Sequence, residues 1–164
     1  MAIVTLRGTE FETVGELPPK GSPAPDFRLT GADLNEIKMV DFSGQRIVLN
    51  IFPSLDTSPC ALSVKRFDEL AGELENTAVL CVSADLPFAQ ARFCGAEGLG
   101  NVVTGSTFRS SFGEDYGAMF RNGPLAGLLS RSVVVIDTDG RVIHTQQVSE
   151  TTDEPDYEAV IAVL

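Results

Sequence analysis

Two short apolar runs separated by one amphipathic segment constrain the fold of this chain more than any other feature. The runs RIVLNIF (residues 46–52) and TAVLCVSA (residues 77–84) are each suited to a strand buried on both faces. Between them, positions 60, 64, 67, 71 and 74 hold Cys, Val, Phe, Ala and Leu, a spacing that a helix places on one face. The pattern therefore predicts two buried strands and a helix that covers them.

The other predicted elements, in chain order, are an N-terminal hairpin with a break at Gly8, a proline-rich surface connection (16–27), a helix (87–98), a strand (101–107), a short helical segment (108–117), a hairpin (130–148) that turns at Asp139-Gly140, and a helix (153–164) with Thr152 or Asp153 as N-cap and Pro155 in its first turn. This order predicts one α/β domain over residues 1–164, with a central mixed β-sheet flanked by helices. Such an arrangement, with its added N-terminal β-hairpin, is a thioredoxin-like fold.

Composition excludes several classes of partner. Of the 164 residues, 43% are hydrophobic and 21% are charged, which is typical of a globular domain. The formal net charge is −11, and the few Lys and Arg residues are scattered, so neither nucleic acid nor an anionic membrane surface is an expected partner. The N-terminal MAIVTLRGTE has no pattern of a secretory signal, and the expected location is therefore cytoplasmic.

The cysteines exclude a disulfide scaffold and a structural metal site. There are three, Cys60, Cys81 and Cys94, without a CxxC pair, and the single histidine is His144. No metal or other cofactor is therefore expected. Cys81 lies among apolar neighbours and is expected in the strand core. Cys94 is followed by a glycine-rich segment, and its residues alone leave two options open, a partner thiol or an ordinary helix-end residue.

Cys60 lies where a buried strand gives way to a helix. Unpaired N–H groups and the helix macrodipole favour an anion there. Lowering a thiol pKa of about 8.5 by ~2 units needs roughly 2.7 kcal/mol, whereas a helix terminus supplies about 0.3 to 1 kcal/mol. Further donors are therefore required, and the candidates are the Thr57 hydroxyl and Arg131, at the start of SVVVID. The alternative is a small apolar residue on the core-facing stripe, but the junction favours a reactive thiolate.

Other cysteine chemistries fit less well. A Cys-His hydrolase needs a histidine partner, and His144 is expected at an ordinary sheet position within VIHTQQV. A thiol-disulfide oxidoreductase normally has CxxC at the helix start, but the residue three after Cys60 is Ser63. Chemistry that needs only a thiolate attacking an electrophile is therefore favoured. A peroxide sensor, or a redox-binding module without significant turnover, is the alternative function.

The segment FPSLDTSPC contains Pro53, Thr57 and Cys60 in the PxxxTxxC pattern of peroxiredoxins. The longer segments NIFPSLDT, CVSADLPFAQARFCGAEGLGNV and EPDYEAVIAVL closely resemble the bacterial thiol peroxidases, which are atypical two-cysteine peroxiredoxins of the thioredoxin-fold superfamily. The resemblance extends from about the N-terminal hairpin to the last residue. One departure is Pro59, because the family commonly has Val or Thr there; Ser58 is expected as N-cap and Pro59 at the first helical position.

The resemblance implies a role for each residue of the site. Cys60 is implied as the peroxidatic cysteine and Cys94 as the resolving cysteine. Pro53 is implied as a shield over the pocket, Thr57 as a hydrogen-bonding orienter, and Arg131 as the arginine that stabilises the thiolate. The resemblance also implies reduction of hydrogen peroxide and organic hydroperoxides to water or alcohols, an intramolecular disulfide, recycling by thioredoxin, and a homodimer.

Overall fold

The predicted strand–helix–strand unit forms the centre of the protein. In the computed structural model, which describes residues 1–164, it consists of β5 (Arg46–Ile51), α1 (Ser58–Ala71) and β6 (Thr77–Ser83). The two strands pair in parallel, and nearly all their residues are buried. Both faces of this pair are covered, which explains why the two segments are apolar at nearly every position in the sequence.

A seven-stranded mixed sheet extends from this pair in the order β4-β3-β7-β6-β5-β8-β9. β6 also pairs in parallel with β7, whereas β8 pairs antiparallel with both β5 and β9. The outer strands are β3 (Arg28–Thr30), β4 (Glu36–Lys38), β7 (Val103–Ser106), β8 (Ser132–Ile136) and β9 (Val142–Gln147). The predicted mixed sheet and the hairpin at Asp139-Gly140 are thus confirmed.

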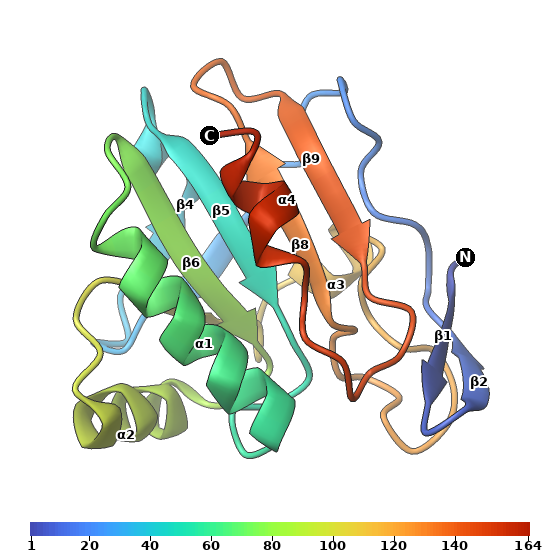
Figure 1. Ribbon diagram of the computed structural model, residues 1–164. Coiled ribbons are helices and arrows are strands. Elements are labelled where there is room, and N and C mark those ends of the chain that lie inside the picture. The colour runs from blue at the N-terminus through green and yellow to red at the C-terminus, as the bar shows by residue number, and fades with distance from the viewer.

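Helices cover both faces of the sheet. α1 and α4 (Tyr157–Ile161) lie on one face, whereas α3 (Phe112–Asp115) lies behind the sheet in Figure 1. Phe67 of α1 and Val160 of α4 belong to the apolar core of the first face, and Phe112 belongs to that of the second. α2 (Pro87–Glu97) lies to one side of α1, at the lower left of Figure 1, near the carboxyl ends of β6 and neighbouring strands. The thioredoxin-like arrangement is therefore confirmed.

The N-terminal hairpin forms a separate two-stranded sheet. Its strands, β1 (Ile3–Leu6) and β2 (Thr9–Glu12), pair antiparallel. Arg7 and Gly8 form the turn with φ of 51° and 83°, the left-handed values that a two-residue hairpin turn requires. The Glu150 carboxylate accepts hydrogen bonds from Gly8 N at 2.9 Å and Thr5 Oγ1 at 3.0 Å. The tip of the hairpin is thereby fixed to the loop that follows β9.

Three local predictions were incomplete or wrong. β3, β4 and a 3-10 helix, η1 (Met39–Phe42), were not predicted, because these elements are short and show no apolar periodicity. The last helix starts later than expected, with Asp156 as N-cap and Pro155 before the helix. α1 is capped by Thr57 rather than Ser58, which makes Pro59 its second residue. The last two errors shift a helix boundary, whereas the first omits two strands at one edge of the sheet.

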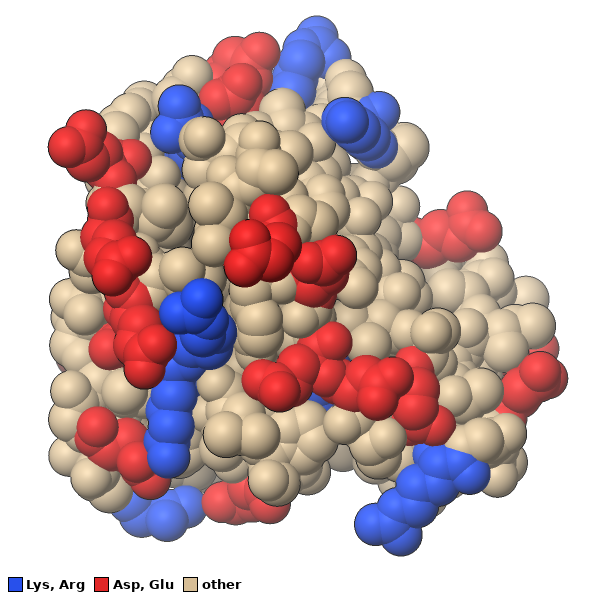
Figure 2. Space-filling view, in the orientation of Figure 1, with Lys and Arg blue, Asp and Glu red and all other residues tan.

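The surface agrees with the acidic composition. On the face shown in Figure 2, acidic side chains are spread over α1, α4 and the neighbouring loops, and the basic ones stand singly among them. No continuous basic area is present on that face. None of the helices has the length and apolar character needed to cross a bilayer.

Candidate active site

Cys60 is the third residue of α1 and has no exposed surface. Its backbone N–H is among those at the helix start for which the helix itself offers no acceptor. The side chain packs with Phe52, Val64 and Cys81 in a small apolar cluster between α1 and the sheet. The chain leaves β5, crosses a short loop and enters α1, and this path places the thiol at the positive end of the helix macrodipole.

Arg131 provides the charged partner of this thiol. Its Nη2 lies 3.0 Å from Cys60 Sγ, and its Nε donates to Thr151 O at 3.1 Å. Arg131 is only 1% exposed, and no salt bridge to a carboxylate compensates its charge. Its carbonyl oxygen accepts from Gln147 Nε2 at 3.0 Å, which fixes the residue at the start of β8. The buried guanidinium is therefore a cationic hydrogen-bond donor to the sulfur that it contacts.

A pocket of about 360 Å³ opens at Arg131, and Cys60 lies behind its wall without lining it. It is lined by the hairpin tip, the loop before α1 and the segment after β9, which contribute Leu6, Arg7, Pro53, Thr57, Ser58, Pro59, Leu125, Arg131, Thr151 and Thr152. Pro53 is buried in its wall. The Thr57 hydroxyl donates to Ser54 O at 3.0 Å and makes no hydrogen bond to Cys60 Sγ. Its proton is committed, so Thr57 can offer only lone pairs to a bound molecule.

Asp85 holds the loop before α1 in place, and the sequence reasoning missed it. Its carboxylate accepts from Ser54 Oγ at 2.7 Å, Leu55 N at 2.9 Å and Ser83 Oγ at 2.6 Å. This carboxylate ties the end of β6 to the loop that carries Pro53 and Thr57. The segment SAD gave no signal for this role, because the hydrogen bonds join residues about thirty positions apart.

Cys94 lies on α2, half-buried, and all three cysteines are free thiols in this structure. Burial, and to a lesser degree the nearby Asp68 carboxylate, raise the pKa of Cys94. The same carboxylate accepts from Asn101 N at 2.8 Å and Val102 N at 3.1 Å, and so fixes the end of the glycine-rich loop after α2. The structure does not place Cys94 in contact with the Arg131 site.

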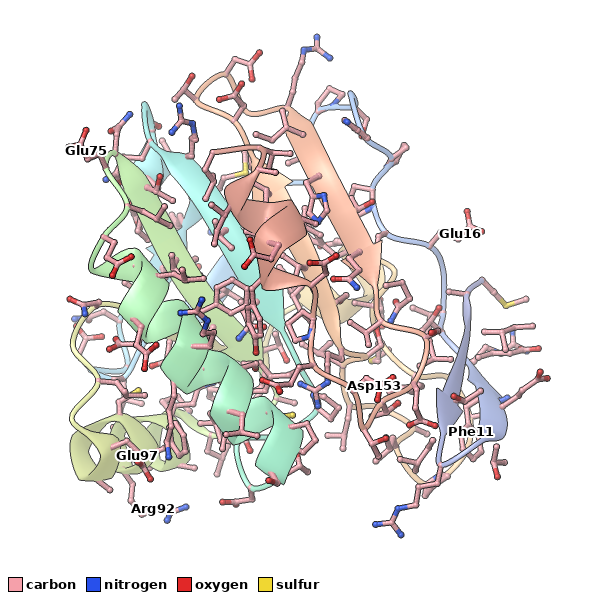
Figure 3. The ribbon with its side chains drawn as sticks, viewed as in Figure 1. Phe11, Glu16, Glu75, Arg92, Glu97 and Asp153 are labelled. Carbon is pink, nitrogen blue, oxygen red and sulfur yellow. The ribbon has the colours of Figure 1, made fainter.

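α2 is attached weakly to the rest of the protein. Only Pro87 and Gln90 of its residues are buried. Two exposed ion pairs connect it to α1 and to the loop before α1, Lys65–Glu97 at 3.0 Å and Arg92–Asp56 at 3.7 Å; Arg92 and Glu97 are labelled on α2 in Figure 3. Exposed pairs contribute about 0 to 1 kcal/mol each. α2 therefore has fewer buried residues to hold it than α1 has.

Cys81 and His144 lie outside the site. Cys81 in β6 is fully buried, and this burial raises the pKa of its thiol to about 12 despite a contact from Asn50 Nδ2 at 3.7 Å. It therefore stays a neutral thiol at ordinary pH. His144 lies in β9 opposite Val135, and burial, followed by the charge of Lys20, lowers its pKa. The predicted core position of Cys81 and sheet position of His144 are both observed.

Comparison with known proteins decides the family. The model of the Redoxin family matches residues 19–161. Thiol peroxidase from Mycobacterium tuberculosis (strain ATCC 25618 / H37Rv) is 58% identical over 164 residues, covering 100% of this chain and 99% of the relative, and that from Corynebacterium glutamicum is 52% identical over the same span. The chain belongs to the thiol peroxidases, peroxiredoxin enzymes of the Redoxin family.

Solved structures agree with the fold of a thiol peroxidase. A peroxiredoxin-like protein from Aquifex aeolicus superposes with a TM-score of 0.94 at 37% identity, covering 99% of this chain and 95% of that one. A thiol peroxidase from Chromobacterium violaceum has a TM-score of 0.91 at 22% identity, with the same coverage. At that lower identity the likeness concerns the fold alone. The assignment of thiol peroxidase activity, which is the reduction of peroxides, rests on the sequence relatives that match the whole of this chain.

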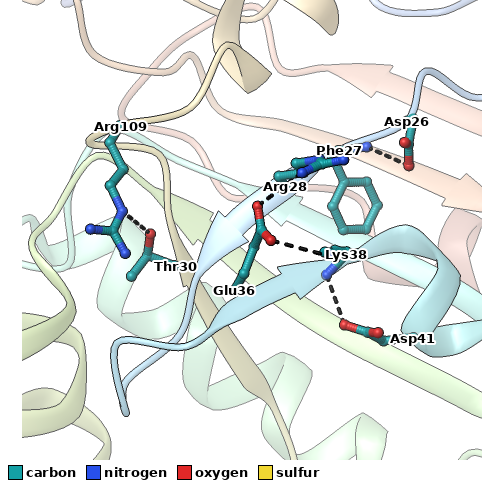
Figure 4. A network of polar contacts seen from close by, with 8 residues as sticks. All are labelled: Asp26, Phe27, Arg28, Thr30, Glu36, Lys38, Asp41 and Arg109. Carbon is teal, nitrogen blue, oxygen red and sulfur yellow. Dashed lines mark hydrogen bonds and ion pairs between the residues drawn. The ribbon is translucent and has the colours of Figure 1, made fainter.

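The largest hollow of this thiol peroxidase lies elsewhere. About 570 Å³ in volume, it is bordered by β3, β4 and the segment before α3. Figure 4 shows its polar contacts: Glu36 lies 3.5 Å from Arg28 and 3.6 Å from Lys38, while Arg109 Nε donates to Thr30 Oγ1 at 3.1 Å. Glu36 thus pairs with two of these three cations, and no cysteine lines the hollow. This hollow therefore offers no thiol for peroxide chemistry.

Proposed function

We propose that Cys60 is the peroxidatic cysteine of this thiol peroxidase. The observation that carries the proposal is the 3.0 Å contact between Arg131 Nη2 and Cys60 Sγ beneath the pocket. The thiolate attacks the terminal oxygen of a hydroperoxide; an S–O bond forms, the O–O bond breaks, and the electron pair leaves with the other oxygen. The products are a Cys60 sulfenic acid and an alkoxide or hydroxide, which takes a proton to give alcohol or water.

Pro53, Thr57 and Arg131 complete this site. Arg131 supplies a cationic donor at the sulfur and a second set of N–H groups toward the pocket. Thr57 offers its lone pairs to the peroxide O–H, because its own proton is donated to Ser54 O. Pro53 contributes an apolar wall that has no N–H and keeps water from the sulfur. Hydrogen peroxide and organic hydroperoxides, alkyl or lipid, are the proposed substrates.

Cys94 acts as the resolving cysteine. Its thiol condenses with the Cys60 sulfenic acid, an S–S bond forms and water leaves. We expect the two Cα atoms to lie beyond the roughly 7 Å limit for a disulfide in the reduced fold. The weak attachment of α2 and the exposed Gly95 and Gly98 support an opening of this helix to bring the sulfurs together. Thioredoxin then reduces the disulfide, in the cytoplasm.

A homodimer is the proposed assembly. Three apolar side chains are exposed: Leu86 (52%) in the loop after β6, Phe88 (68%) at the start of α2, and Phe108 (46%) in the loop after β7. Those loops are joined, because Ser106 Oγ donates to Asp85 O and accepts from Phe108 N. Apolar side chains gathered at one edge are typical of an interface between copies. Phe88→Glu should shift sedimentation velocity toward the monomer, and an unchanged sedimentation coefficient would remove this edge from the interface.

The decisive experiment follows peroxide consumption with and without thioredoxin and its reductase. Wild type should turn over only with thioredoxin, and Cys60→Ser should consume no peroxide. Cys94→Ser should consume one equivalent, accumulate an accessible sulfenic acid and then over-oxidise with excess peroxide. Peptide mapping of oxidised wild type should find a Cys60–Cys94 bridge within one chain. A protein that is oxidised stoichiometrically without turnover is instead a sensor or a redox-binding module.

A further inference from the structure

Two buried polar atoms at the pocket have no hydrogen-bond partner within the chain. One is Nη1 of Arg131, and the other is Oγ1 of Thr151. The two residues are 1% and 6% exposed, and both line the pocket behind whose wall Cys60 lies. Buried polar groups are paired in the large majority of cases, and an unpaired one calls for an explanation. Here the two unpaired atoms border the same pocket.

The position of Thr151 is fixed by its backbone. Its carbonyl oxygen accepts from Arg131 Nε at 3.1 Å, and its N–H donates to Thr5 O at 2.8 Å. Neighbouring Glu150 accepts from Thr152 N at 2.9 Å and from the tip of the N-terminal hairpin. The segment is thus held from both sides while the Thr151 side chain remains unpaired. A group that donates to a reacting atom needs this kind of fixed support.

Three threonines line the pocket, and the hydroxyl protons of two of them, Thr57 and Thr151, are used differently. Thr57 donates its proton to Ser54 O, so it can only accept from a bound peroxide. Thr151 donates to nothing in the chain, so its proton is available to an oxygen in the pocket. Attack by Cys60 places negative charge on the leaving oxygen of the hydroperoxide, and that oxygen needs donors. Arg131 Nη1 and Thr151 Oγ1 are the buried donors without a partner among the residues that line the pocket.

We propose that Thr151 is a catalytic residue of the peroxide reaction, and that its hydroxyl donates a hydrogen bond to the leaving oxygen as the O–O bond breaks. This step deepens the proposed function and rests on Cys60 as the attacking thiolate. Thr151 keeps its proton throughout; the alkoxide or hydroxide that leaves is neutralised by solvent. The ligand class is the hydroperoxide itself, and the interaction is strongest in the transition state.

The test compares Thr151→Val, which keeps the shape and removes the donor, with Thr151→Ser, which keeps the donor. Single-turnover oxidation of Cys60 by tert-butyl hydroperoxide should slow about tenfold in the valine variant, the effect of one lost donor at a charged oxygen, and should return close to wild type in the serine variant. Thr145→Val, a threonine substitution on β9 that does not line the pocket, is the matched control.

Two further rate measurements distinguish this catalytic role of Thr151 from a structural one. With a peracid, whose leaving carboxylate needs little stabilisation, Thr151→Val should slow the reaction less than with tert-butyl hydroperoxide. Alkylation of Cys60 by iodoacetamide, which has no leaving oxygen, should keep the wild-type rate. Equal slowing in all three reactions, or no slowing with tert-butyl hydroperoxide, would overturn the proposal for Thr151. A wild-type chain whose Cys60 does not react with peroxide would instead overturn the proposed function.

Discussion

The contact between Cys60 and Arg131 predicts a measurable energetic coupling between the two side chains. The perturbation is a double-mutant cycle of Cys60→Ala, Arg131→Met and the double variant, each assessed by its free energy of unfolding. Cys60→Ala leaves a buried guanidinium without its only side-chain acceptor. Arg131→Met replaces that charge by an apolar side chain of similar length. The double variant has neither group, so it should lose less stability than the two single variants together.

The magnitude follows from the geometry. The Nη2–Sγ distance is 3.0 Å, both residues are essentially buried, and no carboxylate forms a salt bridge with Arg131. A hydrogen bond to a charged group contributes about 1.5–3 kcal/mol. Leaving a buried charge unpaired costs more, about 3–5 kcal/mol when one partner of a buried pair is removed. We therefore expect a coupling energy of about 2 kcal/mol, with most of the destabilisation in the Cys60→Ala single variant.

Urea denaturation of the four reduced proteins measures the coupling. The control is a second cycle of Cys81→Ala with Arg131→Met, because Cys81 does not contact Arg131 and its effect should add within about 0.3–0.5 kcal/mol. A coupling below about 0.5 kcal/mol would refute an energetically important contact between Cys60 and Arg131.

Three further predictions concern the surroundings of the site. Gly95 lies at an exposed helix position, where an added Cβ meets no atom within 4 Å, so Gly95→Ala should stabilise α2 by about 0.5–1 kcal/mol. In a quenched time course, this variant should form the Cys60–Cys94 disulfide about 2- to 5-fold more slowly than wild type. An unchanged rate would show that α2 opens after the slow step. Cys81→Ala should cost about 1 kcal/mol in urea denaturation and leave peroxide turnover intact, whereas loss of the disulfide would identify Cys81 as the resolving thiol. Hydrogen bonds, chiefly from Thr152 N and Gly8 N, lower the pKa of Glu150 from 4.5 to about 2. The stabilising effect of its carboxylate is therefore present above about pH 5 and is lost as the pH falls toward 2. Glu150→Gln should be less stable than wild type at pH 7, and the difference should narrow over that pH range; a difference independent of pH would contradict this.

The centre of the fold was predictable because the order of apolar residues indicates which segments are buried. The runs that became β5 and β6 are apolar at nearly every position, and the stripe on α1 repeats with helical spacing. β3 and β4 have only three residues each and lie at one edge of the sheet, so neither has a period to detect. At the C-terminus, two Asp residues flank a proline; the structure uses Asp156, which accepts from Ala159 N at 3.1 Å. Sequence alone does not rank Asp153 against Asp156 as N-cap.

The residues of the site also fall into those that the sequence could predict and those that it could not. Cys60 and Thr57 are predictable because both lie at one strand-to-helix junction, and Arg131 was a candidate because it precedes a buried strand. Asp85 and Thr151 carry no such signal. Each acts through hydrogen bonds that join distant parts of the chain, Asp85 to Leu55 and Thr151 to Arg131 and Thr5. Only the folded arrangement of the loops brings Thr151 to the pocket and Asp85 to the loop before α1.

The proposed cycle makes opposite demands on the two cysteines, and the fold divides those demands between two helices. Cys60 must stay buried against Arg131 to react, and α1 is held for this purpose by Val64, Phe67 and Leu70, all buried in the core. The resolving step needs a thiol that can leave its place, and α2 buries little beyond its first turn. Because the energetic cost of opening falls with the apolar area that is exposed, opening should begin in α2, while only the first turn of α1 needs to unwind.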